Sequence, residues 1–338
     1  MLLSPFTSSF ILLLPLVFSA FLHEKTKNIF FIAIVLYTFF LVFYTDISGP
    51  DIETYEYYAY QSCFTNAQTD PLISFFFGFS CYFIDAEHSV KLLVLFLIFL
   101  QIFCIQKIFD NSSLALIVYF GFGNFFLSNF NVVSFNAALT LFLLAVTFRN
   151  IFLRYFFLLI SPLAHIYGLF LALSLISLRL KILAALLLSF LFGLFFNLVL
   201  QYIGIEERLL NYFGKDTGMS LRVIVVFLSS LVLWLIYERY DENLLNKSKN
   251  LLFWSLVIST FLLSLSYFVF INIGVLERLI NPILFIQIYF WLYLFVTKFF
   301  SEFFIKITTV VFLGINLMQS VNDSSNGWSL APFNIIGF

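Results

Sequence analysis

Apolar runs long enough to cross a bilayer recur from one end of this chain to the other. A helix that spans the hydrocarbon core needs about 20 mostly apolar residues. Only 10% of the residues are charged and 62% are hydrophobic, whereas soluble domains contain about 25% charged residues. The runs are unbroken rather than alternating, which favours helices over strands. The sequence therefore predicts an all-α, multi-pass integral membrane protein, and its net charge of -1 suggests no nucleic-acid partner.

The positions of Lys and Arg between the apolar runs predict which loops are cytoplasmic, because cytoplasmic loops carry an excess of basic residues. The first run, 6–22, is followed by Lys25 and Lys27, so we expect its C-terminal end inside the cell. The same rule applied along the chain gives one transmembrane domain over residues 1–338 with about ten spans. The expected cytoplasmic loops are 23–28, 149–154, 238–250 and 298–306, and the expected outer loops are 45–70, 204–221 and 271–282.

Two segments do not fit a simple span. The apolar run 71–84 begins at Pro71 and is too short to cross, so we expect an interfacial or re-entrant helix. Residues 155–178 have basic residues on both sides, so we expect two short helices that break near Pro162, with His165 at their tip. A histidine inside a membrane is a candidate functional residue. A structural histidine that hydrogen-bonds across helices fits the sequence equally well.

The longest polar interruption, which includes outer loop 45–70, holds five acidic residues and no Lys or Arg. Carboxylates accept hydrogen bonds from sugar hydroxyls, aromatic faces pack on sugar C–H surfaces, and a carboxylate also suits a general base. The alternative is a solvated loop whose tyrosines lie in the interfacial belt. We assign Tyr57 and Tyr60 to that belt. The candidates for sugar binding are Asp51, Glu53, Tyr55 and Tyr58.

Three arginines lie in segments expected on the outer face, against the usual bias of basic residues: Arg208, Arg222 and Arg278. The guanidinium group binds phosphate in a bidentate manner, so these side chains suit a lipid-linked sugar diphosphate. Each arginine can instead pair with a neighbour such as Glu207 or Glu277, or contact a lipid head group. Three of them on one face favour anion binding.

The chain contains no motif typical of soluble enzymes. A P-loop, GxGxxG, GxSxG and HExxH are all absent from the sequence. The three cysteines, Cys63, Cys81 and Cys104, form no CxxC pair, so the sequence predicts no metal site and no cofactor. Cys63 and Cys81 both fall in stretches expected outside. A disulfide between them and two small apolar side chains are both open interpretations.

The order of these features resembles the EpsG/Wzy family of bacterial polysaccharide polymerases. The resemblance rests on the outer stretch from Asp51 to Tyr58 and on a helix that opens with Asp70-Pro71-Leu72. It also rests on Phe135-Asn136-Ala-Ala138, on Leu163-Ala164-His165 and on the late loop with Glu277-Arg278. Phe135 stands where the family usually has an arginine, and Asn281 where it usually has a tyrosine.

The resemblance implies a GT-C-like glycosyltransferase in the bacterial cytoplasmic membrane, with its active site facing the periplasm. Such an enzyme joins undecaprenyl-diphosphate-linked oligosaccharides into O-antigen, capsule or exopolysaccharide, without a metal or cofactor. It implies that Arg278 and Arg208 stabilise the leaving diphosphate and that His165 or Asp51 positions or deprotonates the acceptor. Arg222 and Asn136 become further substrate contacts. The implied partners are the lipid-linked oligosaccharide, membrane lipids, a chain-length regulator and a flippase of the same pathway.

Two other classes of membrane protein remain as alternatives. A flippase of lipid-linked oligosaccharide usually shows repeat symmetry and helices broken by Gly or Pro at corresponding positions, and this sequence shows no strong repeat. A membrane acyltransferase that modifies sugars needs a histidine with a partnering acid. His165 has no adjacent carboxylate in the sequence.

Overall fold

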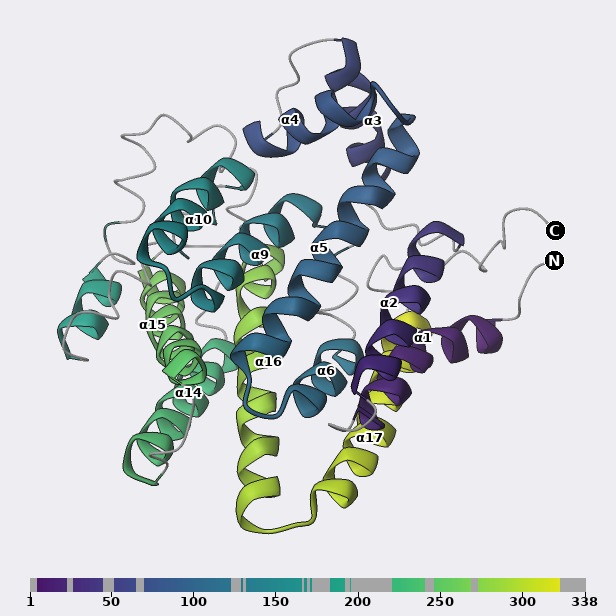
Figure 1. The fold of residues 1–338 in the computed structure, drawn as a ribbon. Helices are drawn as coiled ribbons and strands as arrows, with labels where there is room; N and C mark the ends of the chain where they lie inside the picture. The colour runs from purple at the N-terminus through teal and green to yellow at the C-terminus, as the bar shows by residue number, and fades with distance from the viewer. Residues whose placement is uncertain are drawn as a thin grey trace. The chain divides into compact units, whose positions relative to one another are not determined.

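The computed structural model describes residues 5–22, 27–44, 52–64, 70–122, 129, 132–165, 167–168, 171, 183–191, 195, 221–240, 246–268 and 273–322 (Figure 1). Every regular element within these residues is a helix, which confirms the all-α class. The helices are α1 (Pro5–Ala20), α2 (Lys27–Tyr44), α3 (Ile52–Phe64), α4 (Pro71–Ser80), α5 (Ala86–Ile108), α6 (Ser112–Gly121), α9 (Val133–Thr147), α10 (Ile151–Ala164), α14 (Leu221–Tyr240), α15 (Asn246–Phe268), α16 (Ile273–Lys298) and α17 (Glu302–Asn322).

Three helical segments are long and apolar enough to cross a membrane: Ala86–Ile108, Leu221–Glu238 and Ile280–Lys298. They support the membrane class predicted from the sequence. Shorter apolar helices include Ile29–Val42, Val133–Thr147 and Ile151–Ala164. The count of about ten spans rests on the distribution of charge and stays a prediction.

The chain divides into two compact units, and each is described by itself. The first unit comprises Met1–Leu171 and Leu292–Phe338, and the second comprises Ala172–Trp291. In the first unit, α5 packs against α2, α3, α4, α6 and α9. Figure 1 shows α3 and α4 beside the start of α5, and α6 beside its end. Helix α5 is therefore the element around which this unit is assembled.

A buried polar cluster joins α5, α6 and α9 in the centre of the first unit. The side-chain amide of Gln101 donates hydrogen bonds to Asn129 Oδ1 and Thr140 Oγ1, both at 3.0 Å. Its carbonyl oxygen accepts a bond of 2.7 Å from the Tyr119 hydroxyl. All four side chains are almost completely buried. Polar groups in an apolar interior are costly unless they are paired, so this cluster fixes how the three helices pack.

A second polar group gathers three helix ends. Ser113 Oγ donates to the Ser19 carbonyl at 2.6 Å, which joins the start of α6 to the end of α1. Asn111 Nδ2 donates to Glu302 Oε1 at 3.0 Å, and Lys306 pairs with Glu302 at 2.7 Å, which adds the start of α17. The end of α1 and the start of α17 adjoin loops 23–28 and 298–306, which were expected on the cytoplasmic side. The sidedness of the three helix ends stays a prediction, but the structure places them at one end of the unit.

The two irregular segments have the expected form where the structure describes them. Helix α4 begins with Pro71 and is 10 residues long, so it rises about 15 Å and does not cross a core of about 30 Å. Helix α10 contains Pro162 and ends at Ala164, with His165 as its C-cap residue. The predicted break is confirmed there, whereas the second helix of the predicted pair, up to residue 178, falls largely outside the described residues.

Several expected loops contain helix. Helix α3 occupies the middle of loop 45–70, and α16 begins at Ile273 within loop 271–282. Helix α10 begins at Ile151 and includes Arg154. Polar residues mark where a chain leaves the hydrocarbon, but Glu, Lys and Arg are good helix formers, so helices continue past that point. Residues 204–220 lie outside the described residues, and the sidedness of all these segments stays a prediction.

In the second unit, α14 packs against α15, and the part of α16 up to Trp291 is hydrogen-bonded to α14. Gln287 Nε2 donates to the Val226 carbonyl at 2.6 Å and to Ser230 Oγ at 2.7 Å. The Tyr237 hydroxyl donates to the Phe290 carbonyl at 2.8 Å. These buried bonds fix α16 along α14.

Candidate functional site

The start of α9 is capped by a tyrosine from a distant helix. The first amides of a helix have no intrahelical acceptor, and Val132, the N-cap residue of α9, has no polar side chain. The hydroxyl of Tyr55 accepts a bond of 3.2 Å from the Ser134 amide and lies 3.0 Å from Ser134 Oγ. Tyr55 belongs to α3, 79 residues earlier in the chain. The acidic, tyrosine-rich segment is thereby fixed to the start of α9.

The tyrosines of α3 divide into two groups. Tyr55 and Tyr58 are half-buried, and their rings meet edge-on at 6.4 Å. Tyr57 and Tyr60 are exposed, at 58% and 60%. The first pair are the tyrosines predicted to bind sugar, and the second pair are those assigned to the interfacial belt. The helix thus separates the two groups by exposure, and their roles stay predictions.

His165 lies in a cluster of three rings beside the start of α9. Its ring stacks on Tyr167, with centroids 4.8 Å apart and planes at 25°. Phe135 meets His165 edge-on at 6.1 Å and Tyr167 edge-on at 5.9 Å. Phe135 directly follows Ser134, the residue bonded to Tyr55. The three-ring cluster (Phe135, His165 and Tyr167) therefore adjoins the α3–α9 contact.

The hydrogen bonding of His165 identifies its protonated nitrogen. The Tyr167 amide donates to His165 Nδ1 at 3.2 Å. A backbone amide only donates, so Nδ1 is an acceptor and the proton of the neutral ring is on Nε2. In this tautomer the ring offers an N–H donor, which suits a phosphate or sugar oxygen. It does not offer a basic nitrogen at Nε2.

The turn after His165 depends on a glycine. The Gly168 amide donates to the His165 carbonyl at 2.8 Å, which closes the turn. A Cβ atom on Gly168 would collide with the backbone and the hydroxyl of Ser161. Ser161 is itself fixed, because its Oγ donates to the Ala138 carbonyl at 3.1 Å. Only glycine allows the chain to approach α10 this closely.

Asn136 lies inside the packing rather than at a surface. Its side chain is fully buried, and its Nδ2 donates to the Val132 carbonyl at 3.1 Å. Its backbone carbonyl accepts a bond of 2.6 Å from the hydroxyl of Thr140, a member of the buried polar cluster. The sequence did not single out Ser134, Tyr167 or Gly168. Tyr167 and Gly168 lie two and three residues after His165, and Ser134 directly precedes Phe135.

The structure describes the other predicted residues only in part. Asp51 and Arg208 lie outside the described residues, as do the side chains of Glu53 in α3 and Arg278 in α16. Arg222 is exposed at the start of α14. Arg278 and Pro282 both belong to α16 and lie one helical turn apart. Proline has no amide hydrogen, so the backbone carbonyl of Arg278 does not receive the usual helical hydrogen bond from residue 282.

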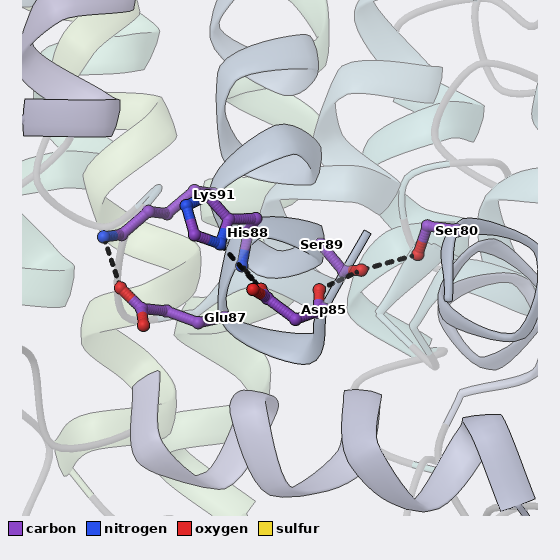
Figure 2. A network of polar contacts seen from close by, with 6 residues as sticks. All are labelled: Ser80, Asp85, Glu87, His88, Ser89 and Lys91. Carbon is purple, nitrogen blue, oxygen red and sulfur yellow. Dashed lines mark hydrogen bonds and ion pairs between the residues drawn. The ribbon is translucent and has the colours of Figure 1, made fainter. Parts of the chain in front are cut away.

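A polar network surrounds the junction of α4 and α5. Asp85 caps α5 and accepts bonds from the His88 amide at 2.8 Å and from His88 Nδ1 at 2.7 Å. These bonds hold the pKa of the Asp85 carboxyl below its usual range. Ser80 donates to Ser89 Oγ at 2.9 Å, and Ser89 donates to the Asp85 carbonyl at 2.7 Å. The whole network comprises Ser80, Asp85, Glu87, His88, Ser89 and Lys91 (Figure 2).

This network ties α4 to α5 through the bond between Ser80 and Ser89, and its Asp85 and His88 side chains bond to each other. Lys91 pairs with Glu87 at 2.6 Å, one helical turn away. In the part of the chain that the structure describes, no group of three or more His, Cys, Asp or Glu side chains is arranged to hold a metal ion. His88 is exposed and bonded to Asp85.

Comparison with known proteins assigns this chain to no family. No protein-family model matches it, and no curated protein or solved structure matches it either.

Proposed function

We propose that this chain is a glycosyltransferase that joins undecaprenyl-diphosphate-linked oligosaccharide units into a polysaccharide, on the outer face of a bacterial cytoplasmic membrane. The observation that carries the proposal is the contact between Tyr55 and Ser134 beside the three-ring cluster. It brings together three segments on which the resemblance to the EpsG/Wzy family rests: the acidic outer stretch, the start of α9 and the end of α10. The proposal includes about ten spans and a GT-C-like arrangement.

The reaction needs an acceptor hydroxyl, a sugar on a diphosphate and a group that takes a proton. The acceptor oxygen attacks the anomeric carbon of the growing chain, the bond from that carbon to the diphosphate oxygen breaks, and undecaprenyl diphosphate leaves. Asp51 takes the hydroxyl proton in this proposal. His165, which carries its proton on Nε2, donates a hydrogen bond that positions a substrate oxygen.

The remaining candidates supply substrate contacts. The aromatic faces of Tyr55 and Tyr58 suit sugar C–H surfaces, and Glu53 suits sugar hydroxyls. Arg278 and Arg208 are assigned to the leaving diphosphate, and Arg222 to a further anionic contact. Asn136 acts by supporting α9 rather than by touching substrate, since its side chain is buried. A chain-length regulator and a flippase of the same pathway are the proposed partners.

A genetic complementation assay tests the proposal. The full chain is expressed with its repeat-unit genes in a host that makes the lipid-linked unit but lacks its own polymerase. A ladder of glycolipid lengths on a gel is the expected result, and Arg278→Ala abolishes it at an unchanged protein level. A single-repeat band with the protein present in the membrane contradicts the proposal and favours a flippase or a sugar acyltransferase.

A further inference from the structure

Helices α3 and α4 pack against each other, and one of their contacts lies near the C-terminal end of each helix, where each carries a cysteine. A Cβ atom added to Gly78 of α4 would lie 3.6 Å from the Ser62 carbonyl oxygen of α3. Cys63 follows Ser62, and Cys81 is the C-cap residue of α4. Both cysteines are half-buried, and the Cys81 thiol lies near enough to the Cys63 thiol to affect its ionisation.

Each thiol is held at this contact by its own helix. Cys63 Sγ donates to the Ala59 carbonyl at 3.2 Å, and Cys81 Sγ donates to the Gly78 carbonyl at 3.3 Å. Both interactions are weak, so rotation of the side chains needs to break little. The third cysteine, Cys104, is fully buried in α5. The pairing is therefore restricted to Cys63 and Cys81.

We propose that Cys63 and Cys81 form a disulfide bond that staples α3 to α4 in the mature protein. The oxidant is a disulfide of an envelope thiol oxidoreductase. One cysteine thiolate attacks that disulfide to give a mixed disulfide, and the second displaces the oxidoreductase thiolate. The two thiols lose two protons and two electrons, and the oxidoreductase becomes a dithiol. The bond rests on the outward placement of α3 that the proposed function also uses, because disulfides persist only in an oxidising compartment.

The raised pKa of Cys63 favours oxidation by a catalyst. Burial and the neighbouring Cys81 thiol raise the pKa of Cys63 to about 11. The thiolate is the attacking species, and little of Cys63 is ionised at neutral pH. Uncatalysed oxidation is therefore slow, and an oxidoreductase that presents a reactive disulfide is the fitting partner.

The staple would complete the anchoring of α3. Near its start, α3 is bonded to α9 through Tyr55 and Ser134. Near its end it would be covalently joined to α4, which is tied to α5 through Ser80 and Ser89. A segment held at both ends presents its half-buried tyrosines in one arrangement, which lowers the cost of ordering it around a substrate.

Thiol counting in the full-length protein tests the bond. Cells are quenched with acid, and the protein is denatured and modified with a polyethylene-glycol maleimide, with or without prior reduction. Of the three cysteines, one should react without reduction and all three after it. Cys63→Ser and Cys81→Ser should each show two reactive thiols under both conditions. Cys104→Ser, the matched control, should show none before reduction and two after it.

Three reactive thiols in the unreduced wild-type protein overturn the disulfide. A membrane-impermeant maleimide applied to intact spheroplasts carrying Cys104→Ser then separates two causes. If Cys63 and Cys81 react from outside, their placement stands and only the bond is wrong. If they react only in inverted vesicles, the outward placement of α3 is wrong, and the orientation assumed for the proposed polymerase is wrong with it.

Discussion

The hydroxyl oxygen of Tyr55 lies 3.0 Å from Ser134 Oγ and accepts a hydrogen bond from the Ser134 amide. A side chain of α3 thus caps α9, a helix that lacks a polar N-cap residue. Capping interactions contribute about 1 kcal/mol to stability. The same contact orients the tyrosine-rich helix beside the three-ring cluster, so stability and the arrangement of the candidate site are coupled here.

Replacing Tyr55 with phenylalanine should lower the stability of the purified protein by about 1 kcal/mol, because the Ser134 amide loses its acceptor. Thermal unfolding in detergent measures the change. Tyr57→Phe is the matched control, since Tyr57 is exposed and its hydroxyl is bonded to Gln61 of the same helix. Equal effects of the two variants would contradict the capping role. Polymer length should shorten in Tyr55→Phe alone.

Two substitutions of His165 separate a positioning role from a basic role. Glutamine places its amide group near the position of Nε2 and so retains a donor there, whereas the shorter asparagine amide reaches only the position of Nδ1. If His165 donates a hydrogen bond to substrate, His165→Gln should keep a detectable polymer ladder and His165→Asn should lose it. Loss of the ladder in both variants, together with a wild-type rate that falls as the pH becomes acidic, would instead identify a general base.

Gly168→Ala should destabilise the turn that carries His165. The added methyl group would collide with the Ser161 backbone, and relief of such overpacking costs about 1–3 kcal/mol. Gly78→Ala is the matched control, because its methyl group would only reach ordinary contact at 3.6 Å from the Ser62 carbonyl. The measurement is the unfolding temperature in detergent. A neutral Gly168→Ala would show that the chain does not approach α10 as closely as described.

The charge on Asp85 should contribute to stability in a defined range of pH. Bonds from His88 lower its pKa in the folded protein, with smaller help from Lys91. The carboxylate therefore stabilises the fold above the ordinary aspartate pKa of about 3.9, and this contribution is lost as the pH falls below that value. Asp85→Asn keeps a capping oxygen without the charge. The unfolding temperatures of the two proteins should differ at neutral pH and converge below about pH 4; a constant difference would contradict this role.

Much of the local structure was readable from the sequence. The apolar runs and their charges gave helices in a membrane, the short run after Pro71 gave α4, and Pro162 with its basic flanks gave the break at His165. These features depend on neighbouring residues and on the length of a bilayer-spanning helix. Contacts between neighbouring residues leave a direct signal in the sequence.

The contacts that assemble the site left a weaker signal. Tyr55 and Ser134 are 79 residues apart, and nothing local to either residue specifies the bond. Asn136 was expected to contact substrate because of the resemblance, but its burial depends on which face of α9 it occupies, and packing decides that. The expected outer loop 271–282 was predicted because it contains Glu277 and Arg278. Both residue types are good helix formers, and α16 includes them.

Reaction with a purified substrate tests the polymerase proposal most directly. The protein is reconstituted into lipid nanodiscs with one undecaprenyl-diphosphate-linked repeat unit, and glycolipid length and released undecaprenyl diphosphate are measured together. The proposal predicts a ladder of lengths, with one undecaprenyl diphosphate released for each new glycosidic bond and none released by Arg278→Ala. Units that stay single, while the same protein in vesicles moves them between leaflets, would contradict it and identify a transporter.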